Sequence, residues 1–301
     1  MRLFRLSALC LVACLAAALP AVAGEVRIKP RSLTLNAHLD LAPGKTLKDG
    51  VVLMVHGTLA HNDMETLKTL RSVLNDRGLN TLAVNLSLGV DDRHGMYDCK
   101  TPHIHKHTDA LDEIGAWLEW LKGQSAGPVI LFGHSRGGNQ SARFAAERGH
   151  ALIEKLVLLA PATWDAAKAA KGFEKAHGRP LAPDFRTAAA LVKAGKGAAL
   201  LAKPGLLYCP SAKVSAASFE SYYRADPRFD TPSILGEVKV PALVMAGSND
   251  AVVADLPEKM AGKADGERVR FKVIDGADHF FLDLYAEDVA DAMQAFIAGE
   301  G

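Results

Sequence analysis

A serine lies between two glycines directly after a short apolar run, in the segment Gly133-His134-Ser135-Arg136-Gly137. A serine hydroxyl is a weak nucleophile unless a neighbouring base takes its proton. The G-x-S-x-G pattern, with a strand predicted before it and a helix after it, is typical of a sharp corner that exposes a nucleophilic serine. Because turns are rich in glycine and serine, the interpretation depends on whether the chain also supplies a base, an acid and oxyanion donors.

Suitable partners follow later in the chain. Asp250 comes directly after an apolar run at 242–246, and His279 lies in a loop after another run at 269–274. We predict that His279 takes the proton of Ser135 and that Asp250 orients and stabilises the imidazole. Taken singly, the serine could be a turn residue, the aspartate a helix N-cap and the histidine a surface residue; their order and flanking segments favour catalysis.

Two backbone N–H groups are the predicted oxyanion donors, those of Thr58 and Arg136, because His56-Gly57-Thr58 forms a turn after a buried strand. The side chain of Arg136 could bind a substrate carboxylate, but we expect it to pair with an acidic loop residue. His56 and His134 are expected to be structural. Asp165 is the alternative acid, although a helix N-cap is its expected role.

Short apolar runs alternate with amphipathic segments, which predicts a parallel sheet covered by helices on both faces. The expected strands are 51–55, 81–86, 129–132, 155–160, 242–246 and 269–274, with an antiparallel hairpin over 27–41. The expected helices are 62–76, 109–121, 136–147 and 283–297. Residues 163–232 are rich in Ala, Lys and Gly and contain no convincing strand, which indicates either surface helices or a cap over the catalytic edge.

With these motifs in this order, the sequence resembles the α/β-hydrolase superfamily over 24–301. The resemblance implies an α/β fold with a mostly parallel eight-stranded sheet, a cap inserted before the acid-bearing strand, a Ser135–His279–Asp250 triad and no cofactor. It fixes the mechanism better than the substrate. We expect a serine hydrolase that cleaves a carboxylic ester or thioester of a small molecule. The alternatives are an aminopeptidase-like amidase, with Glu174, Asp184 or Glu220 holding the substrate amine, and a non-catalytic binding module.

The first 23 residues read as a secretory signal peptide, with Arg2 and Arg5 before an apolar stretch and a cleavage pattern ending at Ala23. Lipidation at Cys14 ranks below simple cleavage because the following residues stay apolar. Cleavage leaves 33 basic against 34 acidic residues. No basic run indicates a nucleic-acid partner, and no later segment is long and apolar enough to span a membrane. We therefore predict a periplasmic or secreted protein.

The mature chain retains Cys99 and Cys209. Export and parity favour a disulfide between them over two buried thiols, since both residues are expected on the catalytic side of the sheet. The loop over 89–108 contains His103, His105 and His107, which an extended backbone would direct to one side. These imidazoles could bind a transition metal, but no metal-site motif supports this. We predict no metal and expect some of them to shape the pocket.

Overall fold

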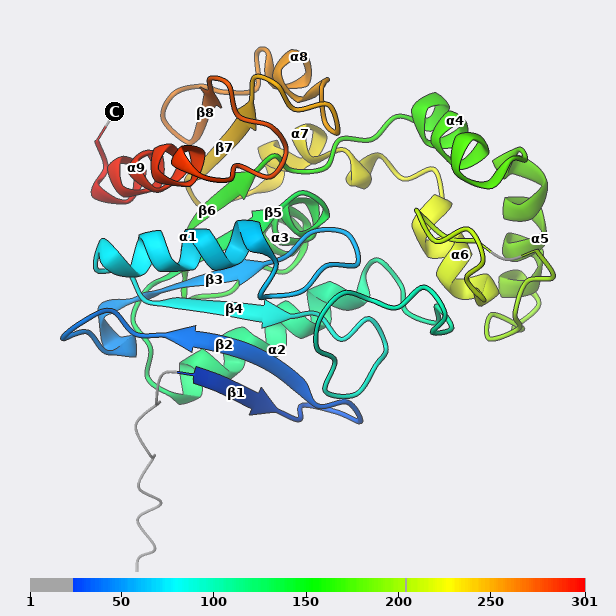
Figure 1. Ribbon diagram of the computed structural model, residues 1–301, viewed down its shortest axis with the longest axis horizontal. Helices are drawn as coiled ribbons and strands as arrows, with labels where there is room; N and C mark the ends of the chain where they lie inside the picture. Colours follow the sequence, from blue (N-terminus) through cyan, green and yellow to red (C-terminus); the bar gives the residue numbers. More distant parts are fainter. Residues whose placement is uncertain (1–23, 204, 301) are drawn as a thin grey trace, which may run out of the picture.

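The computed structural model describes residues 24–203 and 205–300. The strands are β1 (Gly24–Ile28), β2 (Leu35–Asp40), β3 (Val51–Val55), β4 (Thr81–Asn85), β5 (Val129–His134), β6 (Ile153–Leu159), β7 (Ala242–Gly247) and β8 (Val269–Ile274). The helices are α1 (Glu65–Asp76), α2 (Asp109–Gly123), α3 (Arg136–Glu147), α4 (Ala166–His177), α5 (Leu181–Lys193), α6 (Ala216–Tyr223), α7 (Thr231–Ile234), α8 (Leu256–Met260) and α9 (Leu284–Ala298). From β3 to β6 and from β7 to the last helix, strands alternate with helices along the chain, and several helices lie between β6 and β7 (Figure 1).

The eight strands form one sheet in the order β1-β2-β4-β3-β5-β6-β7-β8. β3 to β8 are parallel, and β2 runs against both of its neighbours. Helices α1 and α9 pack together on one face, while α2 and α3 cover the other (Figure 1). Apolar runs such as Val51–Val55 are buried along their whole length, as expected for strands covered on both faces. The predicted α/β-hydrolase fold is confirmed.

Most predicted elements differ from the observed ones by one or two residues at their ends. β5 extends through Gly133 and His134 because these residues continue the ladder with Leu158 and Leu159 of β6. The first helix begins three residues later than predicted, at Glu65, because the preceding residues form a turn in which Met64 N–H donates to the carbonyl of His61. Hydrogen bonding with distant residues and local turns therefore decided these boundaries.

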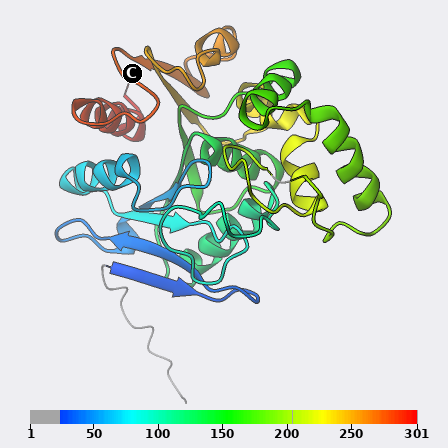
Figure 2. The ribbon, with the colours of Figure 1, turned by 45° about the vertical axis from the view of Figure 1, so that its right-hand side comes forward.

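The segment between β6 and β7 leaves the sheet and carries α4, α5 and α6, which lie beyond the C-terminal ends of β3 and β4 (Figures 1 and 2). Within the described part of 163–232 no residue belongs to the main sheet, in agreement with the predicted helical excursion. We call this segment the cap. No helix in the described ranges is long and apolar enough to cross a membrane. The predicted signal peptide, 1–23, and the Cys14 lipidation site lie outside the described residues.

Candidate active site

Ser135 occupies a strained corner between β5 and α3. Its backbone has φ 55° and ψ −122°, a left-handed conformation that costs energy for a residue with a side chain. Hydrogen bonds on both sides hold it there: its N–H donates to the carbonyl of Leu159 (3.0 Å), and its carbonyl accepts from the N–H of Ala162 (2.9 Å). A strained serine at a strand-to-helix turn is the geometry of a nucleophile elbow.

Glycines permit the close packing around this corner. A Cβ on Gly133 would overlap the carbonyl oxygen of Gly137, and one on Gly137 would overlap the carbonyl oxygen of His56. A Cβ on Gly57 would lie 3.2 Å from the Cβ of Ser135. The turn after β3 therefore lies directly against the serine, as the oxyanion prediction requires.

The loops after β7 and β8 bring Asp250 and His279 to the serine. His279 Nε2 lies 2.9 Å from Ser135 Oγ, and its Nδ1 lies 2.7 Å from Asp250 Oδ2. The other carboxylate oxygen, Oδ1, accepts from the N–H groups of Val252 (2.7 Å) and Val253 (3.0 Å). Burial raises the pKa of Asp250, but these hydrogen bonds, that of His279 foremost, outweigh it and leave the pKa below its ordinary value. The carboxylate thus stays ionised beside the imidazole.

Asp165, the alternative acid, is elsewhere. It is the N-cap of α4, and its side chain accepts from the N–H of Lys168 at 2.8 Å. The expected capping role is confirmed, and Asp250 is the carboxylate that contacts His279.

The predicted oxyanion donors lie on two loops that meet at Ser135. The N–H of Arg136 belongs to the first residue of α3, and the first N–H groups of a helix have no partner within it. Thr58 is in the turn that packs against the serine. Both residues line the same cavity as Ser135. An oxyanion between these N–H groups would also face the positive end of the α3 dipole.

Arg93, which the sequence analysis did not identify, supports the turn His56-Gly57-Thr58. We call this turn the oxyanion turn because it carries one of the two predicted oxyanion donors. Its buried guanidinium donates to the carbonyls of Leu86 (2.7 Å) and Ala60 (2.8 Å) and to Nε2 of His56 (3.1 Å). His56 Nδ1–H in turn donates to the carbonyl of Gly57 (2.9 Å). A charged residue in a polar loop carries no local signal of burial, so only the folded chain reveals this support.

His134 has the structural role expected of it. Its Nε2–H donates to the carbonyl of His279 at 2.8 Å, and the two rings lie 5.0 Å apart. The bond links the residue before Ser135 to the loop that carries His279. His134 therefore helps to position His279.

The expected ion pair of Arg136 is wrong. Its side chain lines the cavity, where Nε donates to Thr58 Oγ1 (3.0 Å) and the guanidinium lies over the ring of Tyr222, 5.4 Å from the centroid. In the described ranges no carboxylate forms an ion pair with it. Its neighbours from the cap and the histidine-containing loop are aromatic or neutral.

A cavity of about 920 Å³ opens over Ser135 and His279. Its floor contains Ser135, His279 and the oxyanion turn, and its other walls come largely from the cap. Aromatic side chains dominate these walls and include Trp164, Phe173, Tyr208, Tyr222, Phe229 and Phe280. The space suits a substrate with a bulky apolar or aromatic group.

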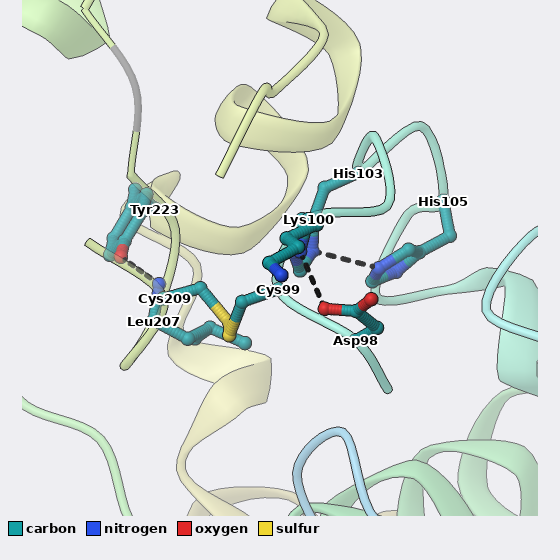
Figure 3. The surroundings of a disulfide bond; sticks show 8 residues. All are labelled: Asp98, Cys99, Lys100, His103, His105, Leu207, Cys209 and Tyr223. Carbon is teal, nitrogen blue, oxygen red and sulfur yellow. Dashed lines mark hydrogen bonds between the residues drawn. A yellow bond between two sulfur atoms is a disulfide. The ribbon is translucent and has the colours of Figure 1, made fainter. Parts of the chain in front are cut away.

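A disulfide joins the loop before α2 to the cap, as predicted: Cys99 and Cys209 are bonded, with Cα atoms 5.3 Å apart (Figure 3). Close by, Tyr223 Oη accepts from the N–H of Leu207 at 2.8 Å. Closing a loop over a sequence separation of 110 restricts the unfolded chain by about 4–5 kcal/mol in the entropy model. The bond also ties the loop before α2 to the cap segment that carries Leu207 and Tyr208, which line the cavity.

The loop histidines are buried and form a cluster with Tyr222 through hydrogen bonds and tilted or edge-on ring contacts. Tyr222 Oη donates to His105 Nδ1 (2.9 Å), whose Nε2 lies 3.3 Å from His103 Nδ1 (Figure 3 shows this second contact). His107 packs edge-on against Tyr222 and Phe229 and lines the cavity, as expected for a pocket-shaping residue.

Three other side chains that could bind a metal lie close together at the edge of the sheet: those of Glu25, Asp92 and His94. They form the only group of three in the described residues whose ligand atoms lie within 4.8 Å of one another. Arg27 forms salt bridges with both Glu25 (2.5 Å) and Asp92 (3.1 Å). The carboxylates are thus already paired with a cation.

Burial lowers the pKa of five histidines around the site: to about 3 for His56 and His105, to about 4 for His103 and His134, and well below the ordinary value for His107. In the unfolded chain histidine binds a proton near pH 6.5, so the contribution of these histidines to stability is full above that pH and falls as the pH drops toward 4. In this range we expect each histidine to lower the free energy of unfolding by about 1.4 kcal/mol for every pH unit of acidification. Denaturant unfolding at pH 7, 6 and 5 measures the total slope.

A matched variant separates these histidines from the carboxylates. His107→Phe removes one buried imidazole, so the unfolded chain of this variant binds one proton fewer. The slope of the free energy of unfolding against pH should therefore fall by up to about 1.4 kcal/mol per pH unit in the same range. A free energy of unfolding that is unchanged between pH 7 and pH 5 would contradict the prediction.

Solved structures share this fold. Est1E from Butyrivibrio proteoclasticus with ferulic acid bound has a TM-score of 0.65 at 20% identity, over 91% of this chain and 98% of that one. The monoacylglycerol lipase of Paleococcus ferrophilus has a TM-score of 0.61 at 18% identity, over 89% and 99%. A thermophilic esterase from Thermogutta terrifontis with malate bound has a TM-score of 0.58 at 20% identity, over 92% and 99%. At these identities the likeness establishes the fold.

No curated protein matches the sequence. Residues 47–283, however, match the family described as serine aminopeptidase, S33, and this range contains the elbow serine, the aspartate and the histidine. The match spans most of the chain and agrees with the sheet order and the strained serine. The chain therefore belongs to the serine aminopeptidase S33 family and is a serine hydrolase of the α/β-hydrolase superfamily.

Proposed function

We propose that the protein is an exported carboxylic-ester hydrolase that acts through an acyl-enzyme on Ser135. His279 Nε2 takes the hydroxyl proton while Ser135 Oγ attacks the acyl carbon, and the backbone N–H groups of Thr58 and Arg136 hold the oxyanion. The proton then passes from His279 to the departing alcohol. Water, deprotonated by His279, releases the acid and regenerates the serine. The Ser135–His279–Asp250 hydrogen-bond chain is the observation that carries this proposal.

The charges of the cavity favour an ester over a peptide with a free N-terminus. An aminopeptidase needs an unpaired acid to hold the substrate ammonium group. None of the three cap candidates, Glu174, Asp184 and Glu220, lines the cavity. Asp184 is paired with Arg179 (2.7 Å), and Glu220 with Arg224 (2.7 Å).

The acids that do line the cavity are already engaged. Asp255 bonds to Lys168 (2.7 Å) and to Thr163 Oγ1 (2.6 Å), and Asp165 caps α4. Among the described residues, Asp165 accepts only a backbone N–H bond, from Lys168, and lies at the start of α4. In the same part of the chain, Arg136 is the cation of the cavity without an ionic partner, and it directly follows the elbow serine. A positive charge at this position is the opposite of what an ammonium group would require.

Two classes of substrate distinguish an ester hydrolase from an aminopeptidase. We expect p-nitrophenyl esters with apolar or aromatic acyl groups to be hydrolysed, and N-acetyl-phenylalanine p-nitrophenyl ester to react at least as fast as the free-amine ester. Efficient cleavage of phenylalanine p-nitroanilide, with poor activity on N-acetylated esters, would instead assign an aminopeptidase. A folded protein inactive on every member of both series would favour a binding module.

Export rests on the predicted signal peptide, and the Cys99–Cys209 bond supports it because disulfides persist in oxidising compartments. N-terminal sequencing of the protein from fractionated cells should find Gly24 first, outside the cytoplasm. A cytoplasmic protein that retains residues 1–23 would refute export and leave the activity proposal intact.

A further inference from the structure

Arg136 places a positive charge on the wall of the cavity beside Ser135 without a carboxylate to balance it. Its Nε–H donates to Thr58 Oγ1, and its guanidinium stacks on Tyr222. Across 24–203 and 205–300, its side chain has no further hydrogen bond and no ion pair. A guanidinium carries five N–H donors, so four remain for a ligand in the cavity.

Other shielded arginines are compensated in one of two ways. Arg71 and Arg143 each pair with a carboxylate, that of Asp40 (2.9 Å) and that of Glu147 (2.9 Å) respectively. Arg93 has no carboxylate, but all three of its guanidinium nitrogens donate to protein acceptors, mostly backbone carbonyls. Arg136, which is half-buried, has neither arrangement, although a charge partly removed from water is costly unless it is paired.

The groups around Arg136 leave its charge unopposed. Burial lowers its pKa, only partly offset by Tyr222 and Tyr223. His107, which faces the same cavity, has a pKa held well below its ordinary value and is therefore neutral. Asp255 is paired with Lys168 across the cavity wall. An anion entering the cavity would meet one half-buried guanidinium with free donors.

We propose that Arg136 binds a carboxylate of the substrate, and that the preferred substrates are esters carrying a second, free carboxylate. A planar guanidinium matches a carboxylate with two parallel hydrogen bonds. The inference rests on the proposed ester hydrolysis and specifies its substrate class. Because Arg136 follows Ser135 directly, the carboxylate lies close to the scissile ester, on its acyl or its alcohol part.

Two pairs of substrates test the proposal and distinguish the two parts of the ester. For the acyl part, the mono-p-nitrophenyl ester of glutaric acid is compared with p-nitrophenyl methyl glutarate, which lacks the charge. For the alcohol part, 4-butyryloxybenzoate is compared with its methyl ester. We expect kcat/KM to favour the anionic member of one pair by about 10- to 100-fold, the range for a hydrogen-bonded charged group, mainly through a lower KM.

Variants assign this preference to Arg136. Arg136→Gln should abolish the ratio of anionic to neutral kcat/KM, and Arg136→Glu should invert it. The double variant Lys168→Gln/Asp255→Asn removes another cavity cation together with its carboxylate partner and should preserve the ratio. Thr58→Val removes the acceptor of Nε but keeps the guanidinium, so the ratio should persist even if both rates fall. A role limited to positioning Thr58 would change both members of a pair equally.

A binding measurement covers the case in which an Arg136 variant is too unstable to assay. Glutarate and benzoate should inhibit the wild-type protein competitively, and replacement by Arg136→Lys should weaken this inhibition while the protein stays folded by circular dichroism. Hydrolysis of neutral esters without any anionic preference, or a preference that survives in Arg136→Gln, would overturn the inference alone. Absence of hydrolysis of every ester would overturn the proposed function and the inference with it.

Discussion

Replacing Asp250 with Asn is expected to lower kcat about 10⁴-fold. The side chain of Asn is nearly isosteric, so the N–H groups of Val252 and Val253 can keep their acceptor. Its amide, however, can present a donor to His279 Nδ1, which stabilises the tautomer with the proton on Nε2. That tautomer cannot accept the proton of Ser135, which lies 2.9 Å from Nε2.

Asp165→Asn is the matched control for this experiment. Asn is also a good N-cap, and Asp165 caps α4 without contacting His279. We expect activity close to that of the wild type. Initial rates on a p-nitrophenyl ester, together with melting temperatures, measure both variants. Loss of activity in Asp165→Asn but not in Asp250→Asn would transfer the acid role to the cap.

Ser135→Ala is expected to reduce kcat about 10⁶-fold, since members of a triad act as a unit. The residual rate would come from binding and from the oxyanion donors, which are backbone groups that the substitution retains. A fluorophosphonate probe should label the wild-type protein at one serine and fail to label this variant. Peptide mapping by mass spectrometry identifies the labelled residue.

Ser233→Ala serves as the control for labelling. Ser233 is exposed and donates to the carbonyl of Pro227 at 2.8 Å. It should label and react as the wild type does. Labelling that persists in folded Ser135→Ala would place the nucleophile elsewhere.

Local patterns were enough to locate the elements and the reactive residues. An apolar run such as 242–246 must be buried, and the residues after parallel strands meet at one edge of the sheet, so Asp250 and His279 could be assigned to that edge. The G-x-S-x-G corner is likewise local, because the overlaps that exclude a Cβ at Gly133 involve Gly137 a few residues away. The number of strands and their mostly parallel arrangement were expected from the resemblance.

Contacts between residues far apart in the chain were decided only by the tertiary structure. Arg93 reads as a loop residue, yet it supports the oxyanion turn because folding brings His56 and Ala60 to it. Arg136 was expected to find an acid, but the side chains that surround it come from the cap and the histidine loop and carry no negative charge. The sequence by itself was enough to predict Ser135, Asp250 and His279 as the candidate triad and to predict the layers that hold them, because burial and turn geometry act over short spacings. The cavity, its aromatic walls and its unpaired cation arise from long-range packing, which no local spacing encodes.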